Sequence, residues 1–490
     1  MKTNYVYYGS PQFHILSDKQ LEELHHASLQ IMERAGIAFE SQEALKILGN
    51  AGADVSNPNR VKIPSYLVEQ ALRKAPKTIT LYSREGEPAI VLNGQTGAHF
   101  GTVPACFGYL DPTTGKIREC YPDDIADMAR LTDSLPNLEW LAPPMHRTTP
   151  AAIADKVGLL QCVLNTPKPV MFFGNDVDSL MEGLSLCALI AGGEEKLKRK
   201  PFVTGMSEPV SPLIQGKDAL EKSFVCAERG IPNVVYGMPM AGATTPATFA
   251  GCLAIANAEI LSQLVAIQLR NPGAPVICGS VPSIMDMKTA ICSYGAPEAA
   301  LMIGALTELC HYYRLPMFGT AACTDSARID AQAGIEITYQ VIISALTGAD
   351  IVHDAGFVYH ATAVSPELMV LTDEVIGMVK VLMGGIEIND ETLPLSLIER
   401  LGPKSNYLSE SHTLKHFRKF WVPRVFDRSF TRTEKTKSCG DMLRERTLEI
   451  LRTYQPKPLA EELIKELKKI EKSWFERLGL KHEYPKGEQG

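Results

Sequence analysis

The chain has 490 residues, with 49 Lys and Arg against 56 Asp and Glu, and a formal charge of −7. Its 45% hydrophobic and 21% charged residues are typical of a globular protein with a large core, and the acidic balance argues against a nucleic-acid partner. Charge, Gly or Pro interrupts each long apolar run, so we expect no membrane-spanning segment. Met1–Gln20 does not resemble a signal peptide. The eleven cysteines include no CxxC pair, which favours a cytoplasmic protein with reduced thiols.

The first predicted elements form an extension ahead of the main body. Ser17–Gln20 has the pattern of a capping box and predicts a helix that ends near Gly36. A second helix is predicted around Ser65–Lys74, and a strand at Thr78–Tyr82. We therefore expect residues 1–95 to form an N-terminal α+β extension packed on the main body.

Residues 96–394 contain eight short apolar runs whose starts lie roughly 30 to 45 residues apart, enough for a strand, a helix and two loops. The predicted strands are His99–Val103, Leu138–Ala142, Val170–Gly174, Phe202–Met206, Asn233–Gly237, Val276–Ser280, Pro316–Thr320 and Ile351–Asp354. The clearest helical patterns between them are Asp123–Leu131, Thr248–Gln268, Pro297–Tyr313 and Asp330–Ala345. Eight strands alternating with helices predict an α/β fold, a closed (β/α)8 TIM barrel. Thr113–Gly115 is the predicted turn of a small inserted hairpin.

Residues 395–490 differ from the barrel and are predicted to be a C-terminal helical extension. Ser411–Phe417 is basic and aromatic, and Phe420–Phe430 carries two Arg and four aromatic residues. Lys457–Leu478 has apolar residues at helical spacing amid alternating charge. This amphipathic helix is expected to pack on the barrel exterior or on a second subunit. The tail therefore favours a homo-oligomer.

Four familiar motifs are absent from the sequence: GxGxxG, GxxxxGK[ST], HExxH and GxSxG. Their absence argues against a dinucleotide-binding domain, a P-loop nucleotidase, a zincin and a typical serine hydrolase. Cys and His do not cluster near any predicted strand end, so we expect no zinc site. The strand ends themselves remain as the place for chemistry, because a (β/α)8 barrel carries its active site where its strands stop.

Three of the middle strands are followed by candidate binding residues. Thr204 and Glu208 belong to the segment that leads from one strand into its loop; Glu208 could hold a cation, act as a base, or be a solvated loop acid. Gly237 begins a small, nearly uncharged loop that suits close approach of a ligand to the backbone, although a tight turn alone would also explain it. Tyr294 could form an aromatic wall.

The last two strands end in the densest group of functional side chains. Gly319 lies at the end of one strand. Thr324 could cap the next helix, with Asp325 near its positive end, or both could act in catalysis. His353 and Asp354 end the other strand, and His353 has both a structural and a functional interpretation. Phe357, Tyr359 and His360 follow and could complete an aromatic cage for a cation.

Several longer segments are distinctive, among them RVKIPSYLVEQALRKAP (60–76), YGMPMAGATTPAT (236–248), GSVPSIMDMKTAICSYGAPEAALM (279–302), TDSARIDAQAGIE (324–336), GADIVHDAGF (348–357), ELMVLTDEVIGMV (367–379) and SHTLKHFR (411–418). In this order they resemble the trimethylamine methyltransferase family of corrinoid-dependent enzymes, and the resemblance covers nearly the whole chain.

The resemblance implies a (β/α)8 barrel that passes a methyl group from a methylated amine to cob(I)alamin on a separate corrinoid protein. This chain would then hold no cofactor permanently, and the barrel opening would receive the partner. The founding enzymes carry pyrrolysine in a neighbourhood that matches Thr324–Ile329, where this chain has only standard residues. It therefore resembles the pyrrolysine-free branch, whose known members act on quaternary amines such as glycine betaine. Many of them have Lys where this chain has Ala327, which leaves the substrate open among glycine betaine, proline betaine, carnitine and γ-butyrobetaine.

The chemistry of this reaction fits a site without an acid–base pair. A quaternary amine leaves as a neutral tertiary amine, so the enzyme has to position the methyl group and exclude water. Tyr294, Phe357 or Tyr359 could hold the ammonium by cation–π attraction, at about 1–2 kcal/mol per ring. Glu208 could supply a counter-charge. His353, Thr204 or a backbone N–H could bind a substrate carboxylate.

Two other hypotheses stay open from the residues. One is a metal-dependent barrel lyase or aldolase, with His353, Asp354 and Asp325 as candidate ligands. The other is a non-catalytic barrel that binds a methylated amine or the corrinoid protein as a sensor.

Overall fold

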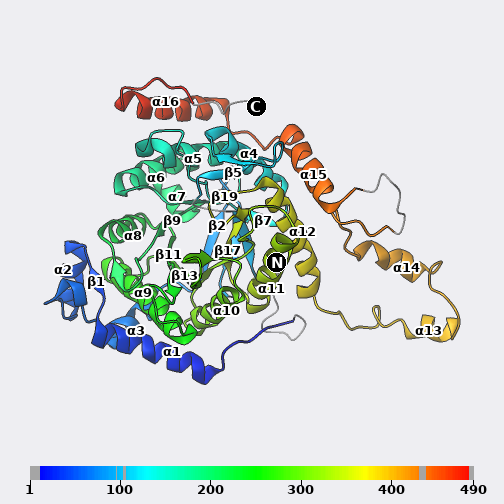
Figure 1. Cartoon of the computed structure of the whole chain (residues 1–490), viewed down its shortest axis with the longest axis horizontal. Helices are drawn as coiled ribbons and strands as arrows, with labels where there is room; N and C mark the ends of the chain where they lie inside the picture. Colours follow the sequence, from blue (N-terminus) through cyan, green and yellow to red (C-terminus); the bar gives the residue numbers. More distant parts are fainter. Residues whose placement is uncertain (1–10, 95–96, 103–105, 430–436, 485–490) are drawn as a thin grey trace.

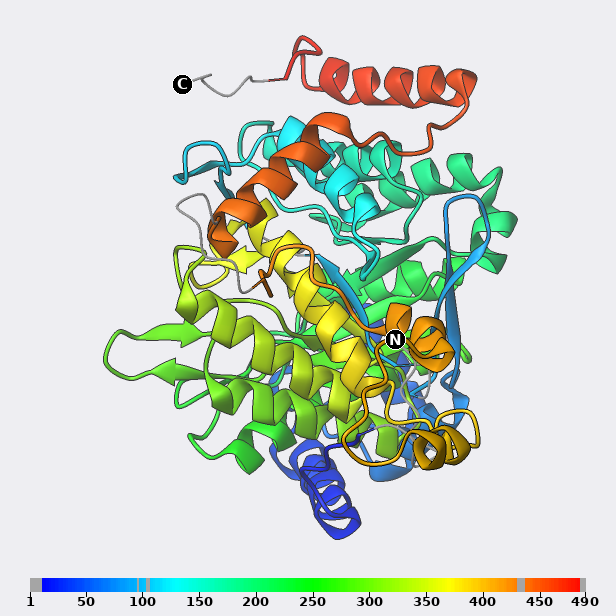
Figure 2. The ribbon, with the colours of Figure 1, turned by 90° about the vertical axis from the view of Figure 1, so that its right-hand side faces the viewer.

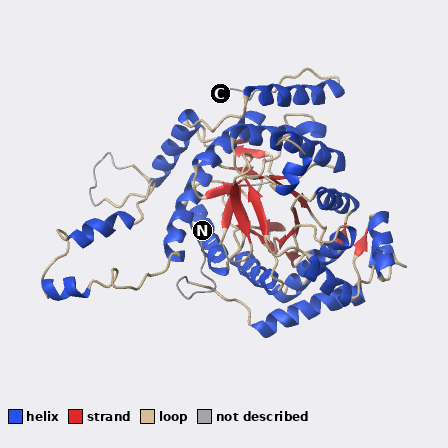
Figure 3. Cartoon of the chain, turned by 180° about the vertical axis from the view of Figure 1, so that it is seen from behind, coloured by secondary structure: helices blue, strands red, loops and turns tan. Residues whose placement is uncertain are grey.

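The computed structural model describes residues 11–94, 97–102, 106–429 and 437–484, and its centre is a parallel barrel ringed by helices (Figures 1 and 3). The barrel strands are β4 (His99–Thr102), β7 (Leu138–Trp140), β8 (Val170–Phe172), β9 (Val203–Ser207), β11 (Asn233–Gly237), β13 (Val276–Ser280), β16 (Met317–Thr320) and β17 (Ile351–Ala355). They pair in the order β7-β4-β17-β16-β13-β11-β9-β8.

The two outer strands of this order also meet. Leu141 forms a parallel bridge with Val170, and the Leu141 N–H donates to the Pro169 carbonyl at 3.1 Å. This contact closes the ring between β7 and β8. The predicted (β/α)8 barrel is therefore confirmed, with each strand within two residues of its expected bounds. Val103, the predicted end of the first strand, lies outside the described residues.

Eight long helices alternate with the strands and cover the outside of the barrel (Figure 3). They are α4 (Pro122–Ser134), α5 (Ala151–Asn165), α6 (Val177–Ala191), α8 (Lys217–Arg229), α9 (Phe249–Arg270), α10 (Pro297–Tyr312), α11 (Ala331–Thr347) and α12 (Pro366–Met383), and the short α7 (Glu194–Arg199) follows α6. Apolar side chains on their inner faces join those of the strands in one continuous core.

The inside of the barrel holds a second core, because successive strand residues point alternately inward and outward. Its large members include Trp140, Tyr236 and Phe318. The antiparallel hairpin of β2 (Ile79–Tyr82) and β3 (Pro88–Leu92) contributes four apolar side chains to the same cluster. The opening of the barrel where the carboxyl ends of the strands meet is called the barrel mouth below.

The N-terminal elements are α1 (Asp18–Gln30), a π-helical turn (Ile31–Ala35), β1 (Ala38–Phe39), α2 (Gln42–Ala51), a 3-10 turn (Pro58–Arg60) and α3 (Ser65–Lys74). The three helices and the π-helical turn pack against α9. The capping box at Ser17 is confirmed, since its side chain accepts from the Gln20 N–H. Gly36 ends this helical run at φ 78°, where an added Cβ would lie 2.7 Å from the Arg60 carbonyl carbon. β1 pairs with β10 (Ile214–Gln215), which ties the extension to the barrel. The division of the chain at residues 95 and 394 stays a prediction.

Within the described part of the chain, α9 is the one helix long and apolar enough to cross a membrane by composition, contrary to the expectation from sequence. However, 83% of the most apolar stretch of this helix is buried inside the molecule. It lies between the N-terminal helices and strands β11 and β13. Its apolar character is explained by this position in the core.

Short strands build a collar on the mouth side. β5 (Gly108–Leu110) and β6 (Ile117–Glu119) form the hairpin predicted at Thr113–Gly115 and pair with β18 (Phe357–Val358) and β19 (Ala363–Val364). A second small sheet joins β12 (Met240–Ala241), β14 (Ser283–Asp286) and β15 (Ile291–Ser293). These segments belong to the connections that follow β4, β11, β13 and β17 in the chain.

The C-terminal elements are α13 (Leu395–Leu401), α14 (Ser411–His416), a 3-10 turn (Phe417–Lys419), α15 (Cys439–Thr453) and α16 (Glu461–Arg477). α15 packs on α12 and α4, and α16 packs on α5, so the predicted amphipathic helix lies on the barrel exterior, as Figures 1 and 2 show. Residues 384–422, called the arm below, include α13 and α14 and extend away from the barrel (Figure 1).

Candidate functional site

Alternation along the strands brings distant residues together inside the barrel mouth. In β11, Tyr236 points inward, and in β17, His353 does the same. The His353 ring lies 5.8 Å from the Tyr236 ring and 4.3 Å from that of Phe318, measured between centroids. Glu208 follows β9 directly and reaches the same space, where it accepts a hydrogen bond from the Tyr236 hydroxyl. Residues of β11, β16 and β17, together with the residue that follows β9, thus contribute to one site.

Glu208 is a partly buried carboxyl group at the edge of this space. Burial raises its pKa, while the hydrogen bond from Tyr236 and the charge of Lys222 oppose the shift. Lys222 also interacts with two other groups. Its Nζ lies 2.9 Å from Asp218 Oδ2 and 4.4 Å from the centre of the Phe173 ring. Glu208 therefore has two polar neighbours. One is the neutral Tyr236 hydroxyl, and the other is the Lys222 ammonium, which also pairs with Asp218.

Asp354 provides a second carboxyl group, and it is fully enclosed. Burial raises its pKa, opposed by the charge of His353 and by the hydrogen bond from Thr320 Oγ1. Its other oxygen, Oδ1, receives no hydrogen bond from the described residues and lies 3.4 Å from His353 Nε2. The backbone of Asp354 has φ 86°, a left-handed conformation that is strained for a residue with a side chain and that concentrates at functional sites.

His353 is oriented by the neighbouring strand. Its Nδ1 lies 2.8 Å from the Gly319 carbonyl oxygen, which can only accept, so Nδ1 carries a proton. Nε2 then faces Asp354. The imidazole is thereby held in one orientation at the base of the mouth.

Tyr294 and Phe357 form an aromatic pair above these groups, with ring centroids 6.3 Å apart. Burial raises the pKa of Tyr294, and the negative charges of Asp354 and Glu208 add to the shift. Both carboxylates therefore lie close enough to Tyr294 to act electrostatically on its phenol group. Asp325 holds this wall in place: it accepts from the Ser293 hydroxyl at 2.5 Å and from the Tyr294 N–H at 2.9 Å.

Three of the residues singled out in the sequence, Thr204, Gly237 and Tyr359, lie apart from this group, and Gly319 contributes only its backbone. Thr204 is buried in β9, on the inward side but below Met206 and thus farther from the mouth. A Cβ at Gly237 would lie 2.9 Å from Glu259 Oε2, so this glycine faces α9. Gly319 contributes its carbonyl to His353. Tyr359 is 49% exposed at the rim. Whether any of the residues singled out from the sequence binds a ligand stays a prediction.

The interpretation of Thr324 as a helix cap is wrong. α11 begins at Ala331, and its N-cap is Asp330, whose carboxylate accepts from the Ala333 N–H. Thr324 Oγ1 instead donates to Glu336 Oε2 on α11, and the same carboxylate oxygen accepts from the Asp325 N–H at 2.9 Å. The loop before α11 is therefore fixed by a side chain from within the helix. Asp325 does not lie at the helix start.

Two cavities of about 550 and 560 Å³ open beside the site on the mouth side. Both are lined by Phe173 and Asn175, and Glu208 lines the second. The first is lined by His146, whose two ring nitrogens are buried without a hydrogen bond from the described residues. Burial lowers the pKa of His146 to about 4, so it is a neutral polar group facing this cavity. His146 was not among the residues singled out from the sequence, although it follows a barrel strand as they do.

The arrangement suits a small cation with an apolar surface. Two carboxyl groups, Glu208 and Asp354, act electrostatically on the phenols of Tyr236 and Tyr294, and the Phe357 ring packs on that of Tyr294. Attraction between a cation and a ring face strengthens when water is excluded, and so does attraction to a carboxylate. Tyr236 was missed from the sequence because its strand offered no signal beyond an aromatic residue in an apolar run.

Comparison with known proteins places these features in a family. The model of the trimethylamine methyltransferase (MTTB) family matches residues 1–473. A trimethylamine methyltransferase of Desulfitobacterium hafniense is 32% identical over 472 residues, covering 95% of this chain and 94% of the relative. A glycine betaine methyltransferase of Desulfitobacterium hafniense strain Y51 is 31% identical over 462 residues, covering 92% and 95%.

A solved structure supports the fold. The monomethylamine methyltransferase of Methanosarcina barkeri aligns with a TM-score of 0.53 and 10% identity, covering 97% of this chain and 90% of that one. Fold and site thus define a (β/α)8-barrel enzyme with an acidic, aromatic mouth. The chain belongs to the trimethylamine methyltransferase family, and its enzyme class is that of a methyltransferase.

Proposed function

We propose that the protein transfers a methyl group from a quaternary amine of the betaine type to cob(I)alamin carried by a separate corrinoid protein in the cytoplasm. The observation that carries this proposal is the pair of carboxyl groups, the partly buried Glu208 and the buried Asp354, beside aromatic rings at the mouth of a barrel from a methyltransferase family. A relative that is a glycine betaine methyltransferase supports the substrate class.

The proposed reaction needs positioning more than acid–base chemistry. The C–N bond breaks, the methyl group passes to cobalt, and the electron pair of the bond stays on nitrogen. The leaving amine is neutral, so no proton has to be delivered to it. Tyr236, Tyr294 and Phe357 would surround the ammonium, and Glu208 would balance its charge. These residues would thus hold the methyl group in line with the acceptor, which is catalysis by orientation.

The methyl acceptor belongs to the partner protein in this proposal, so this chain holds no cofactor permanently. Cobalt has to reach the mouth, and the two cavities that share Phe173 and Asn175 offer a path beside Glu208. His146 would face the approaching cofactor as a neutral hydrogen-bonding group.

The metal-dependent lyase or aldolase is less well supported by the site. Asp325 is engaged by the Ser293 hydroxyl and two backbone N–H groups, and His353 Nδ1 by the Gly319 carbonyl. In the described ranges, the one group of three side chains with metal-ligand spacing lies in the arm, away from the mouth.

The test is transfer to free cob(I)alamin and to a cognate corrinoid protein, followed by the absorbance of methylcob(III)alamin. A panel of quaternary and tertiary methylamines is supplied, with chelator present in a parallel series. We expect transfer from a quaternary amine, unaffected by chelation. Binding of a betaine without transfer to either acceptor would favour the sensor, and activity on another substrate that chelation abolishes would favour the metal-dependent enzyme.

We further propose that the protein is a homo-oligomer in which a second copy covers the arm. The arm leaves many apolar side chains exposed, among them Ile386 at 84% and Leu408 at 86%. Large exposed apolar patches mark interaction sites in soluble proteins, and most soluble oligomers are symmetric assemblies of one chain. Light scattering should give a multiple of 53.7 kDa, and Leu408→Ser with Phe420→Ser should shift the mass downward. A monomeric wild type at micromolar concentration would refute this.

A further inference from the structure

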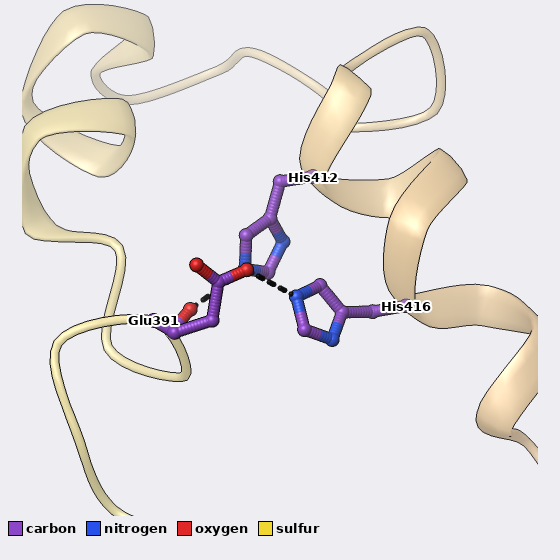
Figure 4. A group of neighbouring side chains, drawn as sticks. All are labelled: Glu391, His412 and His416. Carbon is purple, nitrogen blue, oxygen red and sulfur yellow. Dashed lines mark hydrogen bonds and ion pairs between the residues drawn. The ribbon is translucent and has the colours of Figure 1, made fainter.

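The arm contains a group of side chains that the proposed reaction does not use. Glu391 belongs to the loop between α12 and α13, while His412 and His416 lie four residues apart on α14. Figure 4 shows the three side chains converging from the loop and the helix onto one point. One potential ligand atom from each lies within 4.8 Å of the other two.

Contacts within the group already join the two segments. His416 Nε2 lies 2.8 Å from Glu391 Oε1, and His412 Nε2 lies 3.0 Å from the Glu391 carbonyl oxygen. The two imidazole rings are 4.3 Å apart between centroids. Two histidines at positions i and i+4 of a helix face the same side, so the backbone itself brings the rings together.

These residue types are ligands of one chemical class. Imidazole nitrogens and a carboxylate oxygen suit zinc and similar divalent transition metals, rather than calcium or magnesium. Glu391 presents its carboxylate oxygen Oε1 to His416 Nε2 at 2.8 Å. Lys415 Nζ lies 2.6 Å from the same oxygen, Oε1, and would compete with a metal ion there.

We propose that Glu391, His412 and His416 bind one Zn²⁺ ion per chain, with water in the fourth position. Zinc binds neutral imidazole, so the Nε2 protons that His412 and His416 now direct at Glu391 would move to Nδ1 through solvent and leave each Nε2 free for the ion. Tetrahedral zinc needs ligand atoms about 3.3 Å apart, so the group closes by small side-chain rotations. The bound ion ties the loop before α13 to α14 and fixes the shape of the arm.

The test uses tag-free full-length protein, dialysed with micromolar zinc and then analysed for metal per chain. We expect one zinc per chain. His412→Ala and His416→Ala should each weaken binding by about 100-fold, since even outer-shell changes cost 10- to 100-fold. Cobalt(II) should give the visible bands of a tetrahedral site without sulfur ligands, and trypsin should cleave within the arm more slowly when zinc is bound.

His26→Ala is the matched control, because His26 lies 3.7 Å from Glu22 in another exposed i,i+4 pair that lacks a third ligand. It should leave zinc content unchanged, whereas Lys415→Ala should tighten binding by removing the competitor. Circular dichroism checks that each variant is folded, and Glu391→Gln gives a conservative alternative if an alanine variant is not. Zinc content that is absent in the wild type, or equal in the histidine variants, would overturn the proposal.

Discussion

Replacing Glu208 by glutamine lowers kcat/KM for the quaternary amine about 100-fold, because removing one partner of a desolvated charge pair costs several kcal/mol. The glutamine keeps the size of the side chain and its contact with Tyr236, so only the charge is lost. Steady-state methyl transfer measures the effect. Glu221→Gln is the matched control: this acid lies on α8, lines the same cavity and pairs with Lys217 at 3.8 Å.

The same variant should change the pH profile. Burial raises the pKa of Glu208 and of Asp354, so each carboxylate loses its charge at a higher pH than an exposed one. We expect kcat/KM of the wild type to fall as the pH drops through these raised values. Glu208→Gln should lose part of this acid limb. A variant with wild-type kcat/KM and an unchanged profile would remove Glu208 from the site.

Replacing Tyr236 by leucine should weaken binding of the quaternary amine about tenfold or more, since a ring face in a water-poor site contributes up to about 2 kcal/mol to cation binding. Tyr236→Phe keeps the ring and loses only the hydroxyl that donates to Glu208, so its dissociation constant should change less than the leucine variant's. Calorimetric titration provides both values.

Packing has to be separated from recognition in this experiment, because Tyr236 also lies 5.3 Å from Phe318, centroid to centroid. Thermal unfolding reports how much stability each variant loses. Equal losses of affinity in Tyr236→Phe and Tyr236→Leu would show that the ring face is not what holds the cation.

The sequence predicted the barrel well because its signals are local. Each strand is a short apolar run, and the helix at Ser65–Lys74 has the bounds expected for it. Thr324 shows the limit of local rules: Thr and Asp are good caps, but Asp330 stands closer to the apolar helix pattern and takes that position.

The candidate site depended on contacts between distant segments. Glu208 could equally have been a solvated acid, and only the fold places it beside Tyr236. Asp325 was singled out from the sequence for its place in a loop, whereas its hydrogen bonds to Ser293 and Tyr294 depend on a segment more than 30 residues earlier. The four-residue spacing of His412 and His416 is visible in the sequence, but Glu391 lies 21 residues before His412 and joins the two histidines only through the path of the arm.

The central claim is that the barrel mouth recognises the positive charge of a quaternary amine. Calorimetry tests it directly by comparing each amine that is active in methyl transfer with an analogue in which a tert-butyl group replaces the trimethylammonium group. The two ligands share a shape and differ in charge. Two carboxylates and the surrounding rings should make the amine bind at least about 100-fold more tightly. Equal affinities would contradict the claim.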